Sequence, residues 1–177
     1  LRDKVLNMAI NIHPFIVHMP IGLLSLYTFL EVISIKKLQS LPYWFFVKAI
    51  LVIFGSLGTY AAMFTGSLAA GESKTLLVEV HSDFAFFTTV LYTILAVTYL
   101  LSWFRDKVGS ILENTKFKKV WILVDSMRGF IMRRPVLFPL SIIGFIFISV
   151  TGALGGAMVY GPDIDPVVKF VHGLFVK

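Results

Sequence analysis

Four long apolar stretches constrain the fold of this chain more than any other feature of its sequence. Each has the roughly 20 predominantly apolar residues that a helix needs to cross a bilayer. Hydrophobic residues make up 57 % of the 177, and charged residues only 15 %, below the roughly 25 % of a typical soluble domain. We therefore predict one all-α polytopic membrane domain, an up-down bundle of four transmembrane helices. The predicted spans are residues 14–35, 43–67, 75–103 and 135–160.

The limits of these spans follow from prolines and short connections. Pro14 and Pro135 suit the first turn of a helix, where a missing N–H costs nothing. The short turn from Lys36 to Pro42 makes the first two helices antiparallel neighbours, and the small residues between Gly66 and Ser73 close the second hairpin. The first stretch is longer than the core of a signal peptide and has no Ala-x-Ala-like site before Lys36. We expect this stretch to be a retained helix.

Lysine and arginine are distributed unequally between the two sides of this topology, and the richer side is expected to be cytoplasmic. Eleven belong to one side: Lys36, Lys37, Lys48, Arg105, Lys107, Lys116, Lys118, Lys119, Arg128, Arg133 and Arg134. Five belong to the other: Arg2, Lys4, Lys74, Lys169 and Lys177. Both termini and all four histidines are then predicted on the non-cytoplasmic side of a plasma or inner membrane. The net charge of +6 comes from residues that flank apolar spans, so we predict a lipid bilayer as partner and no nucleic acid.

The connection between residues 104 and 134 contains apolar residues at helical spacing. We predict an amphipathic helix over 116–132, lying on the cytoplasmic leaflet or docking a partner. The residues that recur are Phe117, Val120, Trp121, Val124, Met127 and Ile131. Residues 161–177 are predicted to form a tail on the outer face.

The chain has no cysteine and four histidines, so the imidazoles are the evident means of holding a metal or haem. His18 lies about one turn inside the first predicted helix, and His81 near the start of the third, which runs in the same direction. Helices one and three are diagonal or adjacent in such a bundle, and either arrangement allows two imidazoles to flank one haem. The alternative is a neutral core histidine bonded to a carbonyl at position 18 and a helix-capping histidine at position 81.

The other two histidines are weaker candidates. His13 is predicted just outside the helix, about 140° from His18 at 3.6 residues per turn. His172 lies in the tail, where Asp165 is a candidate cap and Pro166 a candidate first residue of a short helix. A tail helix folded back over the bundle would bring His172 to His13 as a second pair. A solvated histidine at the interface is the alternative for His172.

Small residues cluster in the second and fourth spans. Gly55, Gly58 and Gly66 favour close packing of membrane helices. Gly152, Gly155 and Gly156 lie at the depth of the histidines, and they either permit close packing or leave room for a flat macrocycle. They are therefore candidate cofactor-binding residues.

Two further groups of charged residues are notable. Five carboxylates share the outer side with the histidines, so a non-haem site for iron, copper or zinc is the alternative to haem. These are Glu72, Glu79, Asp83, Asp163 and Asp165. Glu31 and Lys48 lie near the cytoplasmic ends of neighbouring helices, where we predict a structural ion pair.

The sequence resembles a known family at several points. Residues 13–23, His-Pro-Phe-Ile-Val-His-Met-Pro-Ile-Gly-Leu, are similar to the His-Pro-x-x-Val-His-x-Pro-Ile-x-Leu opening of the DUF2231 family of predicted four-helix membrane proteins. Thr65-Gly66 resembles the end of that family's second helix, His81 the histidine that opens its third, and residues 151–160 its closing Gly-Gly-x-x-Val-Tyr element. The resemblance implies the four-span fold and an association with redox proteins. His172 has no equivalent position in that pattern.

Together these features predict a b-type cytochrome-like electron-transfer protein with haem b bound by His18 and His81. His13 and His172 would bind a second haem or hydrogen-bond a propionate, and Arg2, Lys4 or Lys74 would pair with propionates. Expected partners are a membrane quinol, a partner redox subunit or an external cytochrome. An electron carrier or redox subunit is favoured over a stand-alone enzyme, since no nucleophile–base pair is visible. The alternatives are a non-haem metal-binding or metal-reducing protein and a structural subunit of a respiratory complex.

Overall fold

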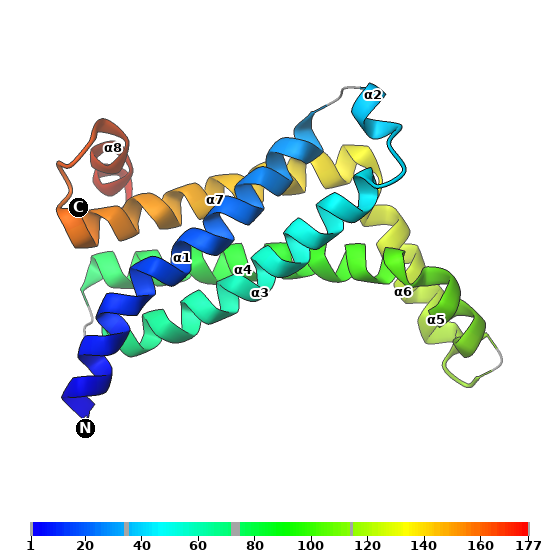
Figure 1. The fold of residues 1–177 in the computed structure, drawn as a ribbon, viewed down its shortest axis with the longest axis horizontal. Coiled ribbons are helices and arrows are strands. Elements are labelled where there is room, and N and C mark those ends of the chain that lie inside the picture. The colour runs from blue at the N-terminus through cyan, green and yellow to red at the C-terminus, as the bar shows by residue number, and fades with distance from the viewer. Residues whose placement is uncertain (1, 34–35, 72–74, 114, 177) are drawn as a thin grey trace.

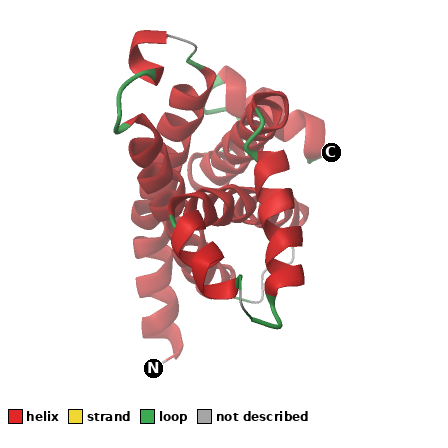
Figure 2. Cartoon of the chain, turned by 90° about the vertical axis from the view of Figure 1, so that its right-hand side faces the viewer, coloured by secondary structure: helices red, strands yellow, loops and turns green. Residues whose placement is uncertain are grey.

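The computed structural model describes residues 2–33, 36–71, 75–113 and 115–176, with side chains described from Ile12 onward except that of Lys36. Within these ranges every regular element is a helix (Figures 1 and 2). The long ones are α1 (Arg2–Val32), α3 (Trp44–Ala70), α4 (Leu76–Trp103) and α7 (Arg134–Tyr160). The short ones are α2 (Lys36–Gln39), α5 (Arg105–Leu112), α6 (Lys118–Ile131) and α8 (Pro166–Phe175). The predicted all-α class is confirmed.

Four of the described helices are long and apolar enough to cross a membrane: Ile12–Val32, Trp44–Ala70, Leu76–Trp103 and Arg134–Tyr160. Their outward faces carry large apolar side chains, such as Phe54, Leu57 and Phe64 on α3, which are more than half exposed. Apolar side chains of this kind are stable in contact with lipid. Helices suit that environment because they satisfy their backbone hydrogen bonds internally. The chain is therefore an integral membrane protein.

The long helices form a closed ring in chain order, because α1 packs on α3, α3 on α4, α4 on α7, and α7 back on α1. Helices α1 and α4 are thus diagonal partners that run in the same direction. Their side chains meet in the middle of the ring, where Thr28 and Tyr92 share a hydrogen bond of 3.0 Å. Figure 1 shows the long helices crossing at an angle and spreading apart at one end.

Glycines on α3 allow α1 to approach it closely. A Cβ atom on Gly55 would lie 2.5 Å from Leu24 Cδ2, and one on Gly58 would lie 2.7 Å from Met19 Cε. Small residues at helix interfaces serve this purpose in membranes, where association depends on van der Waals packing. The expectation of close packing at these two positions is confirmed.

The core between the helices is unusually rich in tyrosine. Tyr27, Tyr92 and Tyr99 are completely buried, and the Tyr27 ring meets the other two edge to face at 6.2 and 5.7 Å. The Ser141 hydroxyl reaches Tyr27 Oη at 3.4 Å, which links α7 to α1. No sequence motif predicted this layer.

Helix α1 corrects one expectation. It begins at Arg2, contains both Pro14 and Pro20 in its interior, and therefore includes His13, which the sequence placed outside the helix. A continuous helix is favoured in lipid because it keeps backbone groups paired on both sides of a proline, and membrane helices tolerate proline for this reason. Pro135, by contrast, lies in the first turn of α7 as predicted.

The second membrane helix, α3, ends later than predicted. Helix α3 continues through Gly66 and ends at Ala70. Gly71, with a φ of 56°, ends the helix in a backbone conformation that favours glycine. Helix α4 then begins after Thr75, whose hydroxyl accepts a hydrogen bond from the Val78 amide at 3.4 Å.

The connection between α4 and α7 folds into two helices, and the second of them, α6 (Lys118–Ile131), is the helix predicted over 116–132. Helix α5 was not predicted, and Trp121 of α6 packs near Gly109 of α5. Val120, Leu123, Met127 and Phe130 of α6 are more than half exposed. Whether this exposed stripe meets lipid or a partner stays a prediction.

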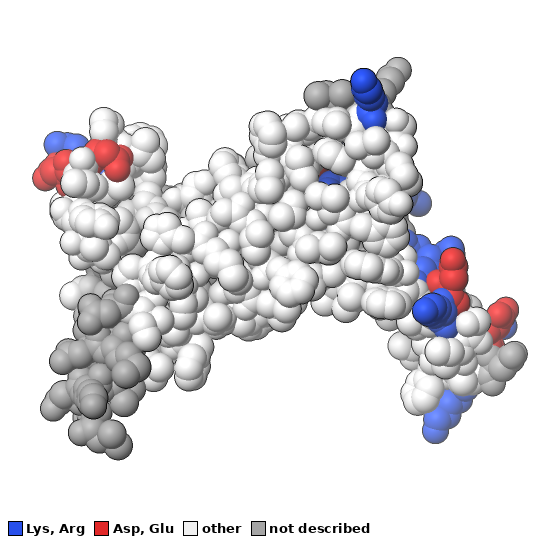
Figure 3. Space-filling model, in the orientation of Figure 1, with Lys and Arg blue, Asp and Glu red and all other residues white. Residues whose placement is uncertain are grey.

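Charge is concentrated at the two ends of the bundle. Figure 3 shows Lys and Arg around α2, α5 and α6, a smaller charged group beside α8, and almost none on the wide surface between. We call the end that carries α2, α5, α6 and Arg134 the cationic end. The opposite end, with the first half of α1, the start of α4 and α8, is the histidine end.

Candidate functional site

The four histidines all belong to elements of the histidine end. His13 and His18 lie in the first half of α1, His81 lies in the second turn of α4, and His172 lies in α8. These segments gather at one end of the bundle in Figure 1. The environments of the four rings are nevertheless different.

His81 connects α4 to α7. Its ring is half-buried, and Nδ1 lies 3.0 Å from the carbonyl oxygen of Thr151. Because a carbonyl only accepts hydrogen bonds, Nδ1 is the donor, and in the neutral ring Nε2 keeps its lone pair. Gly155 lies beside this ring, since a Cβ there would be 3.4 Å from His81 Cε1.

His13 connects α1 to α3 in a similar manner. Its Nδ1 lies 3.0 Å from the hydroxyl oxygen of Thr65, and that hydroxyl donates its own proton to the carbonyls of Ala61 or Ala62, at 3.0 and 3.2 Å. With its proton on one of these carbonyls, the Thr65 oxygen accepts from His13 Nδ1, and in that neutral tautomer Nε2 keeps its lone pair. Gly66 makes room for the ring, because a Cβ there would lie 3.0 Å from His13 Cε1.

These two histidines share the interior faces of diagonal helices. His13 precedes Glu31 by 18 residues, and His81 precedes Tyr99 by 18 residues, which is about five turns in each helix. At the cationic end, Glu31 and Tyr99 meet across the bundle at 2.7 Å. His13 and His81 therefore lie on the faces that meet.

His18 has a different position. It is exposed, and its Nδ1 bonds the carbonyl of Pro14 in its own helix. Its offset of five positions from His13 rotates it about 140° away from the interior face. The described contacts of His18 do not include His81, so the sequence-based pairing of these two residues stays a prediction.

His172 is half-buried on α8. The predicted start of this helix is confirmed, since the Asp165 carboxylate accepts from the amides of Val167 and Val168 at 2.8 and 2.9 Å, and Pro166 is the first helical residue. Helix α8 packs on α7 and α4. A pairing of His172 with His13 on α1 stays a prediction.

The three candidate glycines of α7 serve three different contacts. Gly155 faces His81, Gly156 faces Val168 of α8, and Gly152 faces Ile21 of α1. A Cβ added to Gly156 would lie 3.6 Å from Val168, and one added to Gly152 would lie 4.0 Å from Ile21. Each is an ordinary packing distance, and the one to His81, at 3.4 Å, is the shortest. Their role in holding a macrocycle stays a prediction.

The acidic residues of this end are dispersed. Among the described residues, no three or more His, Asp or Glu side chains are grouped so that they would hold a metal ion. Asp163 pairs with Lys169 at 2.9 Å on the surface. Glu72 and Lys74, and the side chains of Arg2 and Lys4, lie outside the described part of the chain.

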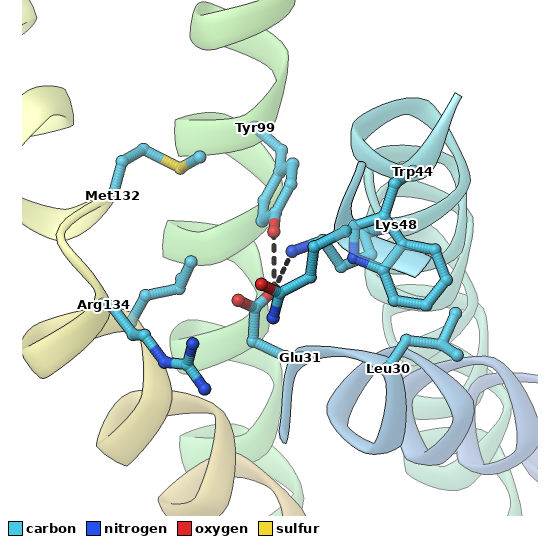
Figure 4. A pocket seen from close by; sticks show the side chains of 9 residues that line it. Leu30, Glu31, Trp44, Lys48, Tyr99, Met132 and Arg134 are labelled. Atoms are coloured by element: carbon cyan, nitrogen blue, oxygen red, sulfur yellow. Dashed lines mark hydrogen bonds and ion pairs between the residues drawn. The ribbon is translucent and has the colours of Figure 1, made fainter. Parts of the chain in front are cut away.

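The cationic end contains the predicted ion pair and a partner that the sequence did not suggest. Lys48 Nζ lies 2.8 Å from Glu31 Oε2, with side-chain exposures of 14 % and 9 %. The Tyr99 hydroxyl donates to the same carboxylate oxygen (Figure 4). The 18-residue spacing of His13 and Glu31, matched by His81 and Tyr99, is the sequence signal that would have identified both faces.

Comparison with known proteins supports the fold. A family model described as a predicted membrane protein (DUF2231) matches residues 9–165. No curated protein and no solved structure matches the chain.

Proposed function

The chain belongs to the DUF2231 family of predicted membrane proteins, and we propose that it is a b-type cytochrome-like electron-transfer protein that binds haem b at its histidine end. One observation carries the proposal. His13 and His81 lie on the interior faces of diagonal helices, and each bonds a threonine through Nδ1, so Nε2 would be the nitrogen offered to a cofactor.

This pair of histidines fits bis-histidine binding of haem iron, for which each residue would supply one neutral imidazole nitrogen. A ligating histidine usually donates its other ring N–H to a carbonyl or another acceptor, which fixes the tautomer and orientation and makes the ligand more basic. Thr151 and Thr65 provide such acceptors. Haem bound there would supply one-electron transfer, and the apolar helices around it would exclude water.

His81 is the ligand that we assign first, and its partner comes from α1. His18 was the partner favoured by sequence, but His13 is the better placed of the two because it shares the interior face with His81, whereas His18 is exposed. His18 and His172 are then candidates for a second haem. The asymmetry of Lys and Arg supports a non-cytoplasmic position for this end, where it would exchange electrons between a quinol or partner subunit and an external redox protein.

A structural role is the second candidate. His13 joins α1 to α3 and His81 joins α4 to α7, so both rings also contribute interhelical hydrogen bonds. In that case the protein would be a subunit that stabilises a larger complex. A non-haem iron, copper or zinc site has less support, because the described histidines and carboxylates form no group of three or more.

Absorbance spectroscopy separates these candidates. Protein purified from haem-replete cells should show a Soret band that shifts on dithionite reduction, with one or two haems per chain. His81→Ala and His13→Ala should each abolish bis-histidine ligation, whereas Ser67→Ala, at an exposed position of the same end, serves as the control.

The outcomes that contradict the proposal are specific. Colourless, iron-free wild-type protein from such cells would exclude haem. If His81→Ala and His13→Ala both keep an unchanged spectrum, the ligands are elsewhere. Colourless protein that loses thermal stability in both variants would favour the structural candidate, and bound zinc or copper would favour the non-haem one.

A further inference from the structure

The cationic end contains a cavity that the proposed haem site does not involve. It has a volume of about 280 Å³ and lies between α1, α3, α4 and α7. Its polar lining comes mainly from Glu31, Lys48, Tyr99 and Arg134, with the Trp44 indole at one side (Figure 4). Trp44 and Arg134 are the first residues of two membrane spans, so the cavity opens at the membrane boundary.

The charge of this cavity is positive. The Glu31 carboxylate is neutralised by Lys48 at 2.8 Å and also accepts from Tyr99 at 2.7 Å. The guanidinium of Arg134 adds one further positive charge. Helices α3 and α7 both begin here, and helix N-termini carry partial positive charge. The lining is therefore complementary to an anion.

A second hollow continues from the first along the outside of α7. It has a volume of about 630 Å³ and is lined by Arg134, Pro135, Phe138 and Pro139. Arg134 lines both hollows, so its guanidinium stands between a polar cavity and an apolar groove. A small soluble anion would gain nothing from the groove, whereas an acyl chain attached to a phosphate would fill it.

We propose that this end of the protein binds an anionic phospholipid. The phosphate would contact the Arg134 guanidinium and the Lys48 ammonium, whose positive charges strengthen hydrogen bonds to phosphate oxygens. One acyl chain would lie against Phe138. Basic pockets between transmembrane helices at the membrane boundary recognise acidic headgroups in this manner, and Trp44 is the aromatic residue typical of that depth.

Lipid binding to the purified protein tests the proposal without a variant. Detergent-solubilised protein is titrated with palmitoyl-oleoyl phosphatidylglycerol or phosphatidylcholine, and bound lipid is counted by native mass spectrometry. We expect one phosphatidylglycerol to be retained about tenfold more strongly than phosphatidylcholine, because a charge-assisted hydrogen bond to phosphate is strong. Equal retention of the two lipids would overturn the proposal.

Matched variants locate the site. Arg134→Gln should remove the preference for phosphatidylglycerol, and Arg133→Gln, an adjacent exposed residue that lines neither hollow, should keep it. Equal losses in both variants would show general surface charge and contradict the assignment. Arg134→Lys is the alternative if Arg134→Gln fails to fold, and because it keeps the positive charge it should keep the preference for phosphatidylglycerol. If folded Arg134→Lys loses the preference while Arg133→Gln keeps it, the preference depends on the guanidinium geometry at this same site.

Inorganic phosphate distinguishes a lipid site from a phosphate site. Millimolar phosphate should leave the bound phosphatidylglycerol in place, since phosphate has no acyl chain to fill the groove. Displacement of the lipid by phosphate would overturn the proposal in favour of a soluble anion.

Discussion

The two ends of this bundle use buried polar groups in opposite ways. At the cationic end, Glu31 receives hydrogen bonds from both Lys48 and Tyr99, so three polar side chains satisfy one another. At the histidine end, His13 and His81 each bond a threonine through Nδ1. The same diagonal faces of α1 and α4 thus carry an ion pair with a shared hydrogen bond at one end and two imidazoles, each tied to a threonine, at the other. We therefore predict the larger contribution to stability from the cationic end and the proposed ligands at the histidine end.

The cationic cluster should give the largest effect on stability. Glu31→Ala leaves the Lys48 ammonium and the Tyr99 hydroxyl buried without their acceptor, and breaking a buried pair in this way costs about 3–5 kcal/mol. The unfolding temperature in dodecyl maltoside, measured by circular dichroism, should fall sharply. Glu79→Ala, at an exposed position, is the control, and an equal change in both variants would disprove the special role of the cluster.

The glycine contact between α1 and α3 should give the next largest effect. A methyl group at Gly55 would meet Leu24 at 2.5 Å, and overpacking of this kind costs about 1–3 kcal/mol. Gly22→Ala is the matched control within the same pair of helices, since nothing lies within 4 Å of a Cβ there. We expect Gly55→Ala to lower the unfolding temperature and Gly22→Ala to leave it unchanged or raise it. A lower unfolding temperature for Gly22→Ala than for Gly55→Ala would show that the two helices are not in close contact at Gly55.

Removing the Thr65 hydroxyl, which bonds His13, tests the histidine end of the comparison. Thr65→Val leaves His13 Nδ1 without its partner on α3, and a lost hydrogen bond of this type costs about 1 kcal/mol. If His13 is a haem ligand, the Soret maximum and the haem affinity should change as well. Ser67→Ala, whose hydroxyl bonds only the carbonyl of Phe64 at 2.8 Å among described contacts, should change neither. A stable Thr65→Val protein with an unaltered spectrum would show that His13 is not part of the haem site.

The smallest expected effect concerns the α5–α6 hairpin. Hydrogen bonds from Arg105 and Arg128 hold the pKa of the Asp125 carboxyl below its ordinary value, because both guanidiniums favour the charged form. Its contribution to stability is therefore present at neutral pH and is lost as the pH falls below about 4.

Trp121 fluorescence measures this transition in a protein with phenylalanine at Trp44 and Trp103. The signal should change in acid, and Asp125→Asn should already show the acid-like signal at pH 7. An acid transition that persists unchanged in Asp125→Asn would assign it to another group.

Sequence reasoning succeeded where the cause is local. The four spans follow from the length of apolar stretches, and the start of α8 follows from Asp165 and Pro166. The Glu31–Lys48 pair was predictable because both residues lie at the same depth on neighbouring helices. In each case the physical cause lies within a few turns of one chain segment or hairpin.

It failed where the rotation of one helix against another decides the outcome. Placing His13 before the helix, on the evidence of Pro14, hid the fact that it continues the interior face that ends at Glu31. Tyr99 was missed as a partner of Glu31 for the same reason, since the two residues are 68 positions apart. Burial of Tyr27, Tyr92 and Tyr99 depends on how the ring closes, and no single helix determines it.

The ring order of α1, α3, α4 and α7 has a consequence for biogenesis. Because each of these helices packs against the one that precedes it, a chain that enters the membrane from its N-terminus can form every neighbouring contact as soon as the next helix is delivered. Low contact order of this kind favours rapid assembly. Only the seam between α7 and α1 has to wait for the last span. A nascent chain that ends before Arg134 should therefore remain an open three-sided assembly, with Tyr27 and Thr28 accessible to chaperones or proteases of the membrane.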